Sequence, residues 1–383
     1  MSPVTTEVRE TYEVLAKLAE GGMGTIYQVR HRHLDQLRVI KVMRPQLGDH
    51  DEFEARFLRE ARMEAQLQHP NIAQLHEFEV TSSGAAYMVM EYIDGVSLKD
   101  ALAATGPLSV PLGLEVGRQS LEALAYLHES GVVHRDISPD NLMFSRDPAG
   151  RPLVKLIDLG IAKRAQEGEE HRITVTGAFL GKVHYASPEQ FRGADIDRRT
   201  DVYSFGIALY ELLTGVFPIP GSDTNSLIAG HLVQPPKSFE ESDPEGRIPE
   251  SLRRIILQAL AKDREERPAT RDFAERLDTL QGEGTWDREE VDRILEAGAR
   301  EPEPVSDTEI PSLLGTAPTL PVTADPETAP TRSLGRTETA GGSLPGQQTW
   351  STRVLGRPGR RWIRVLGVAL ALTTAAIAGV LLA

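Results

Sequence analysis

Two short stretches hold the side chains best suited to chemistry. Residues 134–141 read HRDISPDN and place Asp136 and Asn141 five residues apart, and Asp158 follows an apolar run over residues 153–157. In-line phosphoryl transfer from ATP needs a carboxylate that orients a hydroxyl group, and an amide and a second carboxylate that hold Mg²⁺ against the phosphates. The ordered spacing therefore predicts a site for phosphoryl transfer.

The surrounding patterns show which elements would position these side chains. Strands are predicted over residues 12–29, around a Gly-rich turn, and over residues 37–42 and 87–92, with a helix over residues 51–67. Beyond Gly95 helical patterns dominate, over residues 112–130, 201–214, 222–233 and 249–261. A strand-rich part followed by a helix-rich part predicts two lobes, and ligands favour clefts between lobes.

Composition narrows the functional classes. The chain has 383 residues and a net charge of -14, which argues against nucleic acid as a partner because no surplus of cations is available to neutralise phosphates. Cysteine is absent, so a disulfide framework, a thiol nucleophile and a Cys-based metal site are excluded. The N-terminus has no basic region followed by an apolar one, so no secretory signal is expected there.

The segments after the folded region differ in composition. We expect a folded domain over residues 12–280, a short amphipathic helical extension over 281–300 and a disordered linker, rich in Pro and Thr, over 301–360. Residues 365–383 carry no charge and would span roughly 28 Å as a helix, close to a hydrocarbon core of about 30 Å.

A single transmembrane helix over residues 363–383 follows from that length. Five arginines precede the uncharged residues 365–383, which places the folded domain on the cytoplasmic side of the cell membrane, as in a tail-anchored protein. The alternative is a buried C-terminal helix, but a core helix would show a wider polar stripe.

Taken in order, these motifs resemble the bacterial, membrane-bound Ser/Thr protein kinases of eukaryotic (Hanks) type, over residues 12–280. The resemblance implies an α+β fold with a small β-rich N-lobe and a larger helical C-lobe. It also implies ATP and Mg²⁺, or Mn²⁺, as cofactors. Asp136 then matches the catalytic base, and Asn141 and Asp158 match the metal ligands.

In the small lobe the resemblance assigns the remaining nucleotide contacts. The Gly-rich loop that lies over the phosphates matches Ala19, Gly21, Gly22 and Gly24. Lys41 matches the strand lysine that neutralises the phosphates, and Glu60 matches its helical partner. Met90 matches the gatekeeper, and Glu91 to Ile93 match the backbone that contacts adenine. Taken singly, the Gly-rich match is equally typical of a simple hairpin, Lys41 of a solvated lysine at a strand end, and Glu60 of an ordinary helical glutamate.

Three further residues match structural positions of the large lobe: Glu189 at the end of the activation segment, Asp201 in the central helix, and Arg267 as the ion-pair partner of that Glu. Kinases of small molecules generally lack these elements, so protein substrates are favoured over a small-molecule phosphotransferase. Thr174 and Thr176 match the phosphorylated positions of bacterial relatives, where a phosphate would order the loop against Arg135. The alternative is that a polar loop simply contains threonines.

Two departures from the family pattern concern charge near the transferred phosphate. Ser138 stands where most Ser/Thr kinases carry Lys, and Lys182 stands where they carry Thr. Our hypothesis is that the Lys182 ammonium substitutes for the missing charge and so acts in catalysis; the alternative is that it points to solvent. Leu159 replaces the usual Phe, a conservative exchange.

Two functions of different classes therefore compete. The first is an active Ser/Thr protein kinase that autophosphorylates in its activation loop and modifies cytoplasmic proteins. The second is a membrane-anchored pseudokinase scaffold, favoured only by Ala19 and Ser138. A homodimer, and phosphothreonine-binding partners that recognise the linker threonines, are further partners that the sequence leaves open. The linker's other role is that of a tether.

Overall fold

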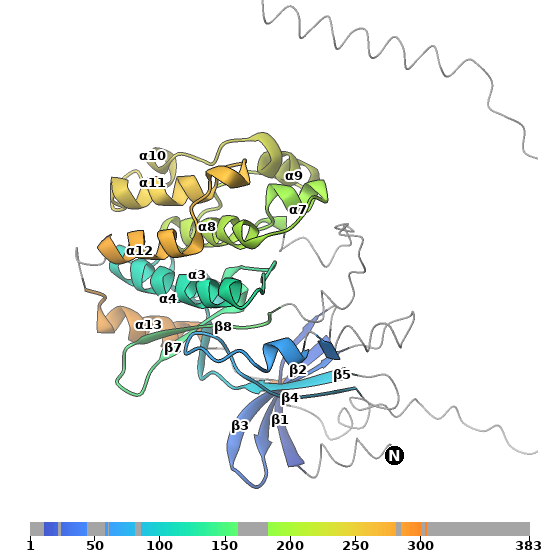
Figure 1. The fold of residues 1–383 in the computed structure, drawn as a ribbon. Coiled ribbons are helices and arrows are strands. Elements are labelled where there is room, and N and C mark those ends of the chain that lie inside the picture. Colours follow the sequence, from blue (N-terminus) through green and yellow to red (C-terminus); the bar gives the residue numbers. More distant parts are fainter. Residues whose placement is uncertain are drawn as a thin grey trace, which may run out of the picture. The chain divides into compact units, whose positions relative to one another are not determined.

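The computed structural model of the 383-residue chain describes residues 11–21, 24–43, 58–59, 61–80, 86–159, 183–280, 285–299 and 303–304. All of them belong to one compact unit, Met1–Pro321; the second unit, Val322–Ala383, lies outside the described residues. Within the described part, strands gather at one end and helices at the other (Figure 1). The bilobal α+β arrangement expected from the sequence is confirmed.

The small lobe is an antiparallel sheet with the strand order β4-β5-β3-β2-β1-β9. On β5, Tyr87 and Val89 join one hydrophobic cluster, and Met88 and Met90 join another on the opposite face. Because both faces are buried, β5 is a continuous apolar run rather than an alternating one. The strands of this sheet are β1 (Tyr12–Gly21), β2 (Gly24–His31), β3 (Gln36–Met43), β4 (Leu75–Val80), β5 (Ala86–Glu91) and β9 (Glu303–Pro304).

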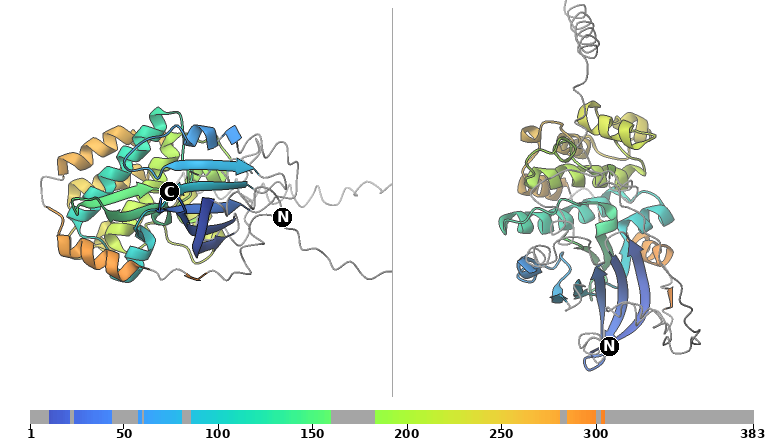
Figure 2. Two further views of the ribbon diagram at one scale, coloured as in Figure 1. Left: turned by 90° about the horizontal axis from the view of Figure 1, so that it is seen from below. Right: turned by 90° about the vertical axis from the view of Figure 1, so that its right-hand side faces the viewer.

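The large lobe is built around helix α8 (Arg198–Thr214), of which every residue from 200 to 214 is buried. A helix that is buried all round lies at the centre of a lobe. Asp197 caps its start by accepting a hydrogen bond from the backbone N–H of Arg199, and Gly215 ends it in the left-handed conformation. Helices α4 (Val110–Glu129), α11 (Glu250–Ala259) and α12 (Thr270–Leu280) pack around it (Figure 2).

Shorter elements complete the large lobe. They are helices α3 (Leu98–Thr105), α7 (Pro188–Arg192), α9 (Thr224–Val233) and α10 (Phe239–Ser242), and the 3₁₀ turns η1 (Pro139–Asn141) and η3 (Arg264–Glu266).

A small second sheet carries the chemically important stretches. It has the order β6-β7-β8, with β6 (Gly95–Ser97), β7 (Leu142–Arg146) and β8 (Pro152–Leu156). β7 and β8 form an antiparallel hairpin in which Leu142 lies opposite Leu156. Asn141 therefore precedes one strand at the point where Asp158 follows the other, and a backbone hydrogen bond of 2.9 Å from the N–H of Ile157 to the carbonyl of Asn141 continues the ladder.

The segment after α12 contacts both lobes. Helix α13 (Arg288–Gly298) packs on α3 and β6, and its Val291 and Ile294 are buried in the core of the large lobe. Farther along the chain, Glu303 and Pro304 form β9 and pair with Lys17 and Ala16 on β1. Glu303 and Pro304, which the prediction assigned to the linker, thus pair with an edge of β1 whose backbone groups would otherwise be unpaired at these two positions.

The predicted elements and the observed ones agree in type and differ at their ends. The helices predicted from residues 112, 201 and 249 begin at Val110, Arg198 and Glu250, because Ser109, Asp197 and Pro249 occupy the N-cap positions. The helix predicted over 51–67 lies partly outside the described residues, which include a helical stretch at 61–64.

The membrane prediction falls on residues that the structure leaves undescribed. No helix in the described ranges is both long and apolar enough to cross a membrane. The span predicted over residues 363–383, and the predicted linker apart from residues 303–304, lie outside those ranges.

Candidate active site

The loop at residues 134–141 is anchored to α8 by the fully buried carboxylate of Asp201. Asp201 accepts hydrogen bonds from the backbone N–H groups of His134 (2.8 Å) and Arg135 (2.7 Å), and its Oδ2 lies 2.8 Å from Nε2 of His128. Burial alone would raise the pKa of Asp201, but the hydrogen bond and charge of His128 and the amide of His134 outweigh it and hold the pKa below its usual range. The predicted structural role of Asp201 is thus the placement of this loop.

The loop backbone is strained where it turns toward the cleft. Arg135 has a φ of 68° and Asp158 a φ of 56°, both in the left-handed region that residues with a Cβ seldom adopt. Such strain persists only where the surroundings fix it, and it gathers at functional sites. Here Asp201 fixes Arg135 from one side, and the side-chain amide of Gln190 on α7 donates to the Arg135 carbonyl at 3.0 Å from the other.

Asp136 and Asn141 are brought together by the η1 turn. The side-chain amide of Asn141 donates to the backbone carbonyl of Asp136 at 2.7 Å and to its carboxylate Oδ2 at 3.3 Å. The amide nitrogen is thereby committed to the loop, which leaves the side-chain oxygen of Asn141 as the atom that suits a cation. The Asp136 carboxylate is oriented by the same contact.

Lys41 and Asp158 join the two lobes at the cleft. The Lys41 ammonium on β3 lies 2.7 Å from Oδ2 of Asp158, which follows β8, although 117 positions separate them in the chain. The Lys41 side chain is 7% exposed and that of Asp158 is 29% exposed. A cation with little solvent around it, next to a more accessible carboxylate, suits a ligand that carries both phosphates and a metal ion.

The donor set fits a magnesium ion that binds together with phosphates. Mg²⁺ is usually held by one or two carboxylates, with phosphate oxygens and water completing its shell, rather than by an all-protein cage. Asp158 and Asn141 supply one carboxylate and one amide oxygen on adjoining backbone. Accordingly, the described ranges contain no cluster of three or more His, Asp or Glu side chains of the kind that holds a metal by itself.

Gly21 and Gly24, at the two ends of the β1–β2 turn, have different surroundings. A Cβ on Gly24 would lie 2.1 Å from the carbonyl oxygen of Val42 on β3, so a side chain is excluded there. A Cβ on Gly21 would meet nothing within 4 Å, which leaves open space beside the turn. Ala19 lies opposite Ile26 in the β1–β2 ladder, as a strand residue. Gly22 lies outside the described residues.

At the junction of the lobes, the three predicted adenine-side residues occupy different settings. Met90 is 8% exposed and packs in the small-lobe core, as a gatekeeper position requires. The Glu91 N–H donates to the Gln74 carbonyl at 2.9 Å, and its carboxylate pairs with Lys155 at 2.9 Å. Ile93 is buried. The Glu91 side chain thus links β5 to β8.

The predicted ion pair between Glu189 and Arg267 is present as a bidentate contact. The guanidinium nitrogens lie 2.7 and 2.9 Å from the two carboxylate oxygens, and both side chains are buried. Burial tends to raise the pKa of Glu189, but the hydrogen bonds and charge of Arg267 and a hydrogen bond from Thr200 lower it overall. The pair fixes α7 to the loop before α12.

Several predicted site residues cannot be placed. Glu60, Lys182, Thr174 and Thr176 lie outside the described residues, so their assigned roles stay predictions. Ser138, at the position where a lysine is usual, is 4% exposed and begins the η1 turn. Any compensating charge must therefore come from another residue.

Two positioning residues were missed by the sequence reasoning. His128, near the end of α4, contacts both Asp201 and the hydroxyl of Thr270 (2.8 Å). Gln190 supports Arg135 from α7. A polar residue on an apolar helical face is a weak signal for His128, and nothing in the local pattern singles out Gln190.

The arrangement matches proteins of known family. Residues 12–277 match the model of the protein kinase domain. The chain is 36% identical over 260 residues to the serine/threonine-protein kinase pkn3 of Myxococcus xanthus, covering 68% of this chain and 48% of that protein. It is 37% identical over 252 residues to PrkC of Bacillus subtilis, covering 66% and 37%. It is 36% identical over 271 residues to PknB of Mycobacterium tuberculosis, covering 69% and 42%.

A solved structure agrees with this. The kinase domain of M. tuberculosis PknI is 28% identical, with a TM-score of 0.53, and the match covers 70% of this chain and 96% of that one. The chain spans less than half the length of the three curated relatives. Because the family model matches residues 12–277 and the three relatives are 36–37% identical, the chain belongs to the protein kinase family, among the bacterial Ser/Thr kinases of eukaryotic type.

Proposed function

We propose that the chain is an active protein kinase that transfers the γ-phosphate of ATP to Ser or Thr hydroxyls of proteins. The observation that carries the proposal is the contact of 2.7 Å between Lys41 and Asp158 across the cleft, next to the bonded pair of Asp136 and Asn141. Both pairs include a residue at the same end of the β7–β8 hairpin, where Asn141 precedes β7 and Asp158 follows β8.

Each of these residues has a role in that reaction. The Asp136 carboxylate orients the substrate hydroxyl and accepts its proton, while Lys41 places a positive charge against the nucleotide phosphates. Bound Mg²⁺, held by Asp158 and Asn141, would neutralise the charge that gathers on the phosphate oxygens. The loop supports from Asp201 and Gln190 keep these atoms in place, as preorganised catalysis requires.

Incubation of the full chain with labelled ATP, Mg²⁺ or Mn²⁺ and a generic basic protein tests the proposal. We expect incorporation into the added protein and into the chain itself. Asp136→Asn should reduce the rate at least a thousandfold (on the order of 4 kcal/mol) while nucleotide binding is kept. Full incorporation by that variant, or nucleotide binding without transfer by the wild type, would favour the pseudokinase scaffold instead.

Lys182 is proposed to replace the charge that the family pattern places at position 138. The support is that Ser138 is buried and carries no charge. Lys182→Ala should then lower kcat far more than it changes KM for ATP, because the lost contact strengthens in the transition state. Ser138→Lys in that background should restore part of kcat. An unchanged kcat in Lys182→Ala would contradict the idea.

Regulation and location complete the proposal. Autophosphorylation at Thr174 or Thr176 would add about -1.5 to -2 charge and order the activation segment against Arg135, whose backbone is already fixed by α7 and α8. Membrane tethering rests on the uncharged residues 365–383 alone. Mass spectrometry of the autophosphorylated chain and its partition into lipid vesicles test the two points separately.

A further inference from the structure

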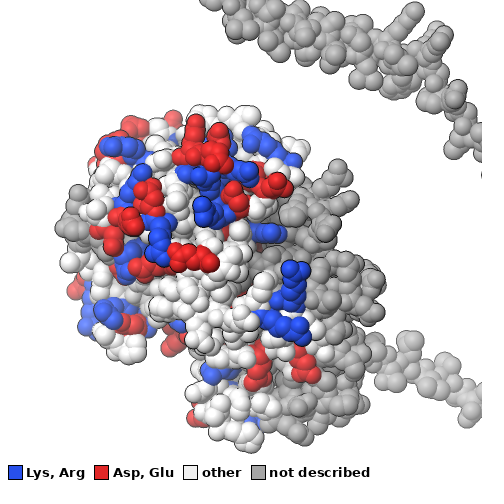
Figure 3. All heavy atoms as spheres, viewed as in Figure 1, with Lys and Arg blue, Asp and Glu red and all other residues white. Residues whose placement is uncertain are grey.

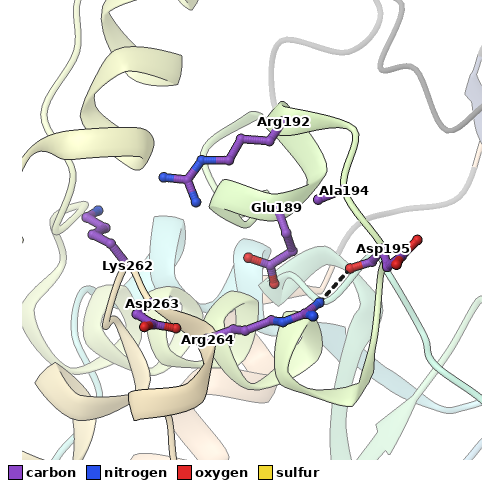
Figure 4. A pocket seen from close by; sticks show the side chains of 7 residues that line it. All are labelled: Glu189, Arg192, Ala194, Asp195, Lys262, Asp263 and Arg264. Atoms are coloured by element: carbon purple, nitrogen blue, oxygen red, sulfur yellow. Dashed lines mark hydrogen bonds between the residues drawn. The ribbon is translucent and has the colours of Figure 1, made fainter.

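A cavity lies in the large lobe, and residues 134–141 do not line it. It has a volume of about 480 Å³ and is lined by side chains from α7, from the α7–α8 connection and from the turn after α11 (Figure 4). None of the lining residues comes from residues 134–141 or from β8. They are Glu189, Arg192, Ala194, Asp195, Lys262, Asp263 and Arg264.

Two of the three basic residues at this cavity have no carboxylate partner within the described ranges. The Lys262 ammonium donates to the Tyr203 hydroxyl and to the Gly230 carbonyl, both at 3.2 Å. Arg192 makes one long hydrogen bond, of 3.4 Å, to the Leu232 carbonyl. All of these acceptors are neutral.

Neighbouring arginines are different, because each has a carboxylate. Arg264 lies 3.7 Å from Asp197, and Arg267 holds Glu189. The Glu189 carboxylate that lines the cavity is therefore already neutralised. Over the face of the molecule seen in Figure 3, basic and acidic side chains are likewise interspersed. Two cations of one cavity that lack an ion-paired carboxylate among the described residues are thus a departure from their surroundings, in a chain with a net charge of -14.

The energetic cost of this arrangement is visible at Lys262. Burial, and next the positive charges of Arg267 and Arg192, lower the pKa of Lys262 to about 8. A cation that is partly removed from water and faces other cations is stabilised by any anion that enters. The cavity is large enough for such a group, and Figure 4 shows Lys262, Arg192 and Arg264 around it, with the Glu189 carboxylate between them.

Charge matching favours one kind of anion. Arg192 and Lys262 together match a phosphomonoester, which carries about -1.5 to -2 charge, better than a carboxylate, which carries one. Asp195 and Asp263 also line the cavity and would repel an extended polyanion such as a nucleic acid strand. The site thus suits a single phosphate on an otherwise uncharged or basic chain.

We propose that this cavity binds the phosphate group of a phosphorylated polypeptide, through Arg192 and Lys262, and so docks a phosphorylated substrate or partner beside the activation segment. The choice of a polypeptide as the carrier rests on the proposed kinase function. The binding of a phosphate group at this cavity does not rest on the proposed kinase function, because no lining residue acts in phosphate transfer.

Calorimetric titration of the full chain, without nucleotide, tests the proposal. The probes are a short phosphothreonine peptide, the same peptide with Thr or with Glu, and inorganic phosphate. We expect the phosphopeptide to bind at least tenfold more tightly than the Glu peptide and than free phosphate, and the Thr peptide to show no binding. Arg192→Ala and Lys262→Gln should each weaken phosphopeptide binding about tenfold.

Three control variants establish whether the phosphopeptide binds at this cavity. Arg198→Ala removes an exposed arginine near the same connection and should change nothing. Lys41→Met removes the cation of the nucleotide cleft and should also leave peptide binding unchanged. Lys262→Arg keeps the charge and should retain binding, with a wild-type Tm as the check that each variant folds.

The outcomes are distinct. Equal binding by Arg192→Ala and the wild type overturns the proposal, as does loss of binding in Lys41→Met alone. Equal affinity for free phosphate shows a small-anion site, and equal affinity for the Glu peptide shows a carboxylate site; either result overturns the phosphopeptide assignment. Because the assay measures binding in the absence of ATP, an absence of phosphopeptide binding would not contradict the proposed kinase activity.

Discussion

Glu290 on α13 should stabilise the domain even though it lies beyond the region that matches the family. Its carboxylate accepts hydrogen bonds from the backbone N–H of Ser109, at 2.8 Å, and from the Ser109 hydroxyl, at 2.5 Å, and Glu290 is 7% exposed. Ser109 is in turn the N-cap of α4, the helix that ends close to the catalytic loop. The contact therefore ties the extension to an element that positions the site.

The expected magnitude follows from those two bonds. Hydrogen bonds to a charged group contribute roughly 1.5–3 kcal/mol each, and removal of the carboxylate also relieves its desolvation, so Glu290→Ala should cost about 2–3 kcal/mol. For a domain of this size about 1 kcal/mol shifts Tm by roughly 2–4 °C, which gives a decrease of about 4–12 °C. Differential scanning calorimetry or thermal fluorescence of the full chain measures it.

The neighbouring Glu289 is the matched control. It is exposed, on the same helix turn, so Glu289→Ala should lower Tm by no more than about 1–2 °C. The double variant Ser109→Ala/Glu290→Ala should lose less than the sum of the single variants, because both remove the bond between the Ser109 hydroxyl and the Glu290 carboxylate. If Glu289→Ala and Glu290→Ala have equal effects, or if the two Ser109 and Glu290 changes are additive, the reasoning is wrong.

Two further predictions concern the glycine turn and an ion pair. Gly24→Ala should lower Tm by several degrees, because the new Cβ would meet the Val42 carbonyl at 2.1 Å, whereas Gly21→Ala should leave Tm near the wild-type value. Glu189→Gln should reduce stability at pH 7 by about 2–4 kcal/mol, because Arg267 is left as an unpaired buried cation. The folded-state pKa of Glu189 lies below its ordinary value of 4.5. The Tm difference between Glu189→Gln and the wild type should therefore persist above pH 4.5 and narrow as the pH falls below 4.5. A constant Tm difference from pH 7 to pH 3 would contradict the assignment.

The elements with strong periodicity were predictable from the sequence. Helices α4 and α11 lie where their apolar periodicity places them, and α8 and β5, which are buried on all sides, lie where their largely apolar runs place them. Their ends shifted by one to three residues, because N-caps such as Asp197 act outside the apolar pattern. The attachment of α13 was not predictable, because an ordinary amphipathic pattern does not show which surface its buried Glu290, Val291 and Ile294 will contact.

The chemical identity of the site came from the sequence. Residues 134–141 and Asp158 carry the side chains that phosphate transfer needs, and a hairpin of predictable length joins them, so their proximity follows from local structure. The supports of that loop did not follow in the same way. Asp201 was matched as structural, but its bonds to His134 and Arg135, and the contribution of His128, depend on how α4 and α8 pack.

The tertiary structure decided the contacts that join distant segments. It placed Lys41 against Asp158 over a separation of 117 residues, paired β1 with β9, and left Arg192 and Lys262 at one cavity without an ion-paired carboxylate among the described residues. Residue types and spacing determine which reactions a chain can support, because they fix its functional groups. Which of those groups meet depends on the packing of whole lobes, to which local propensity contributes little.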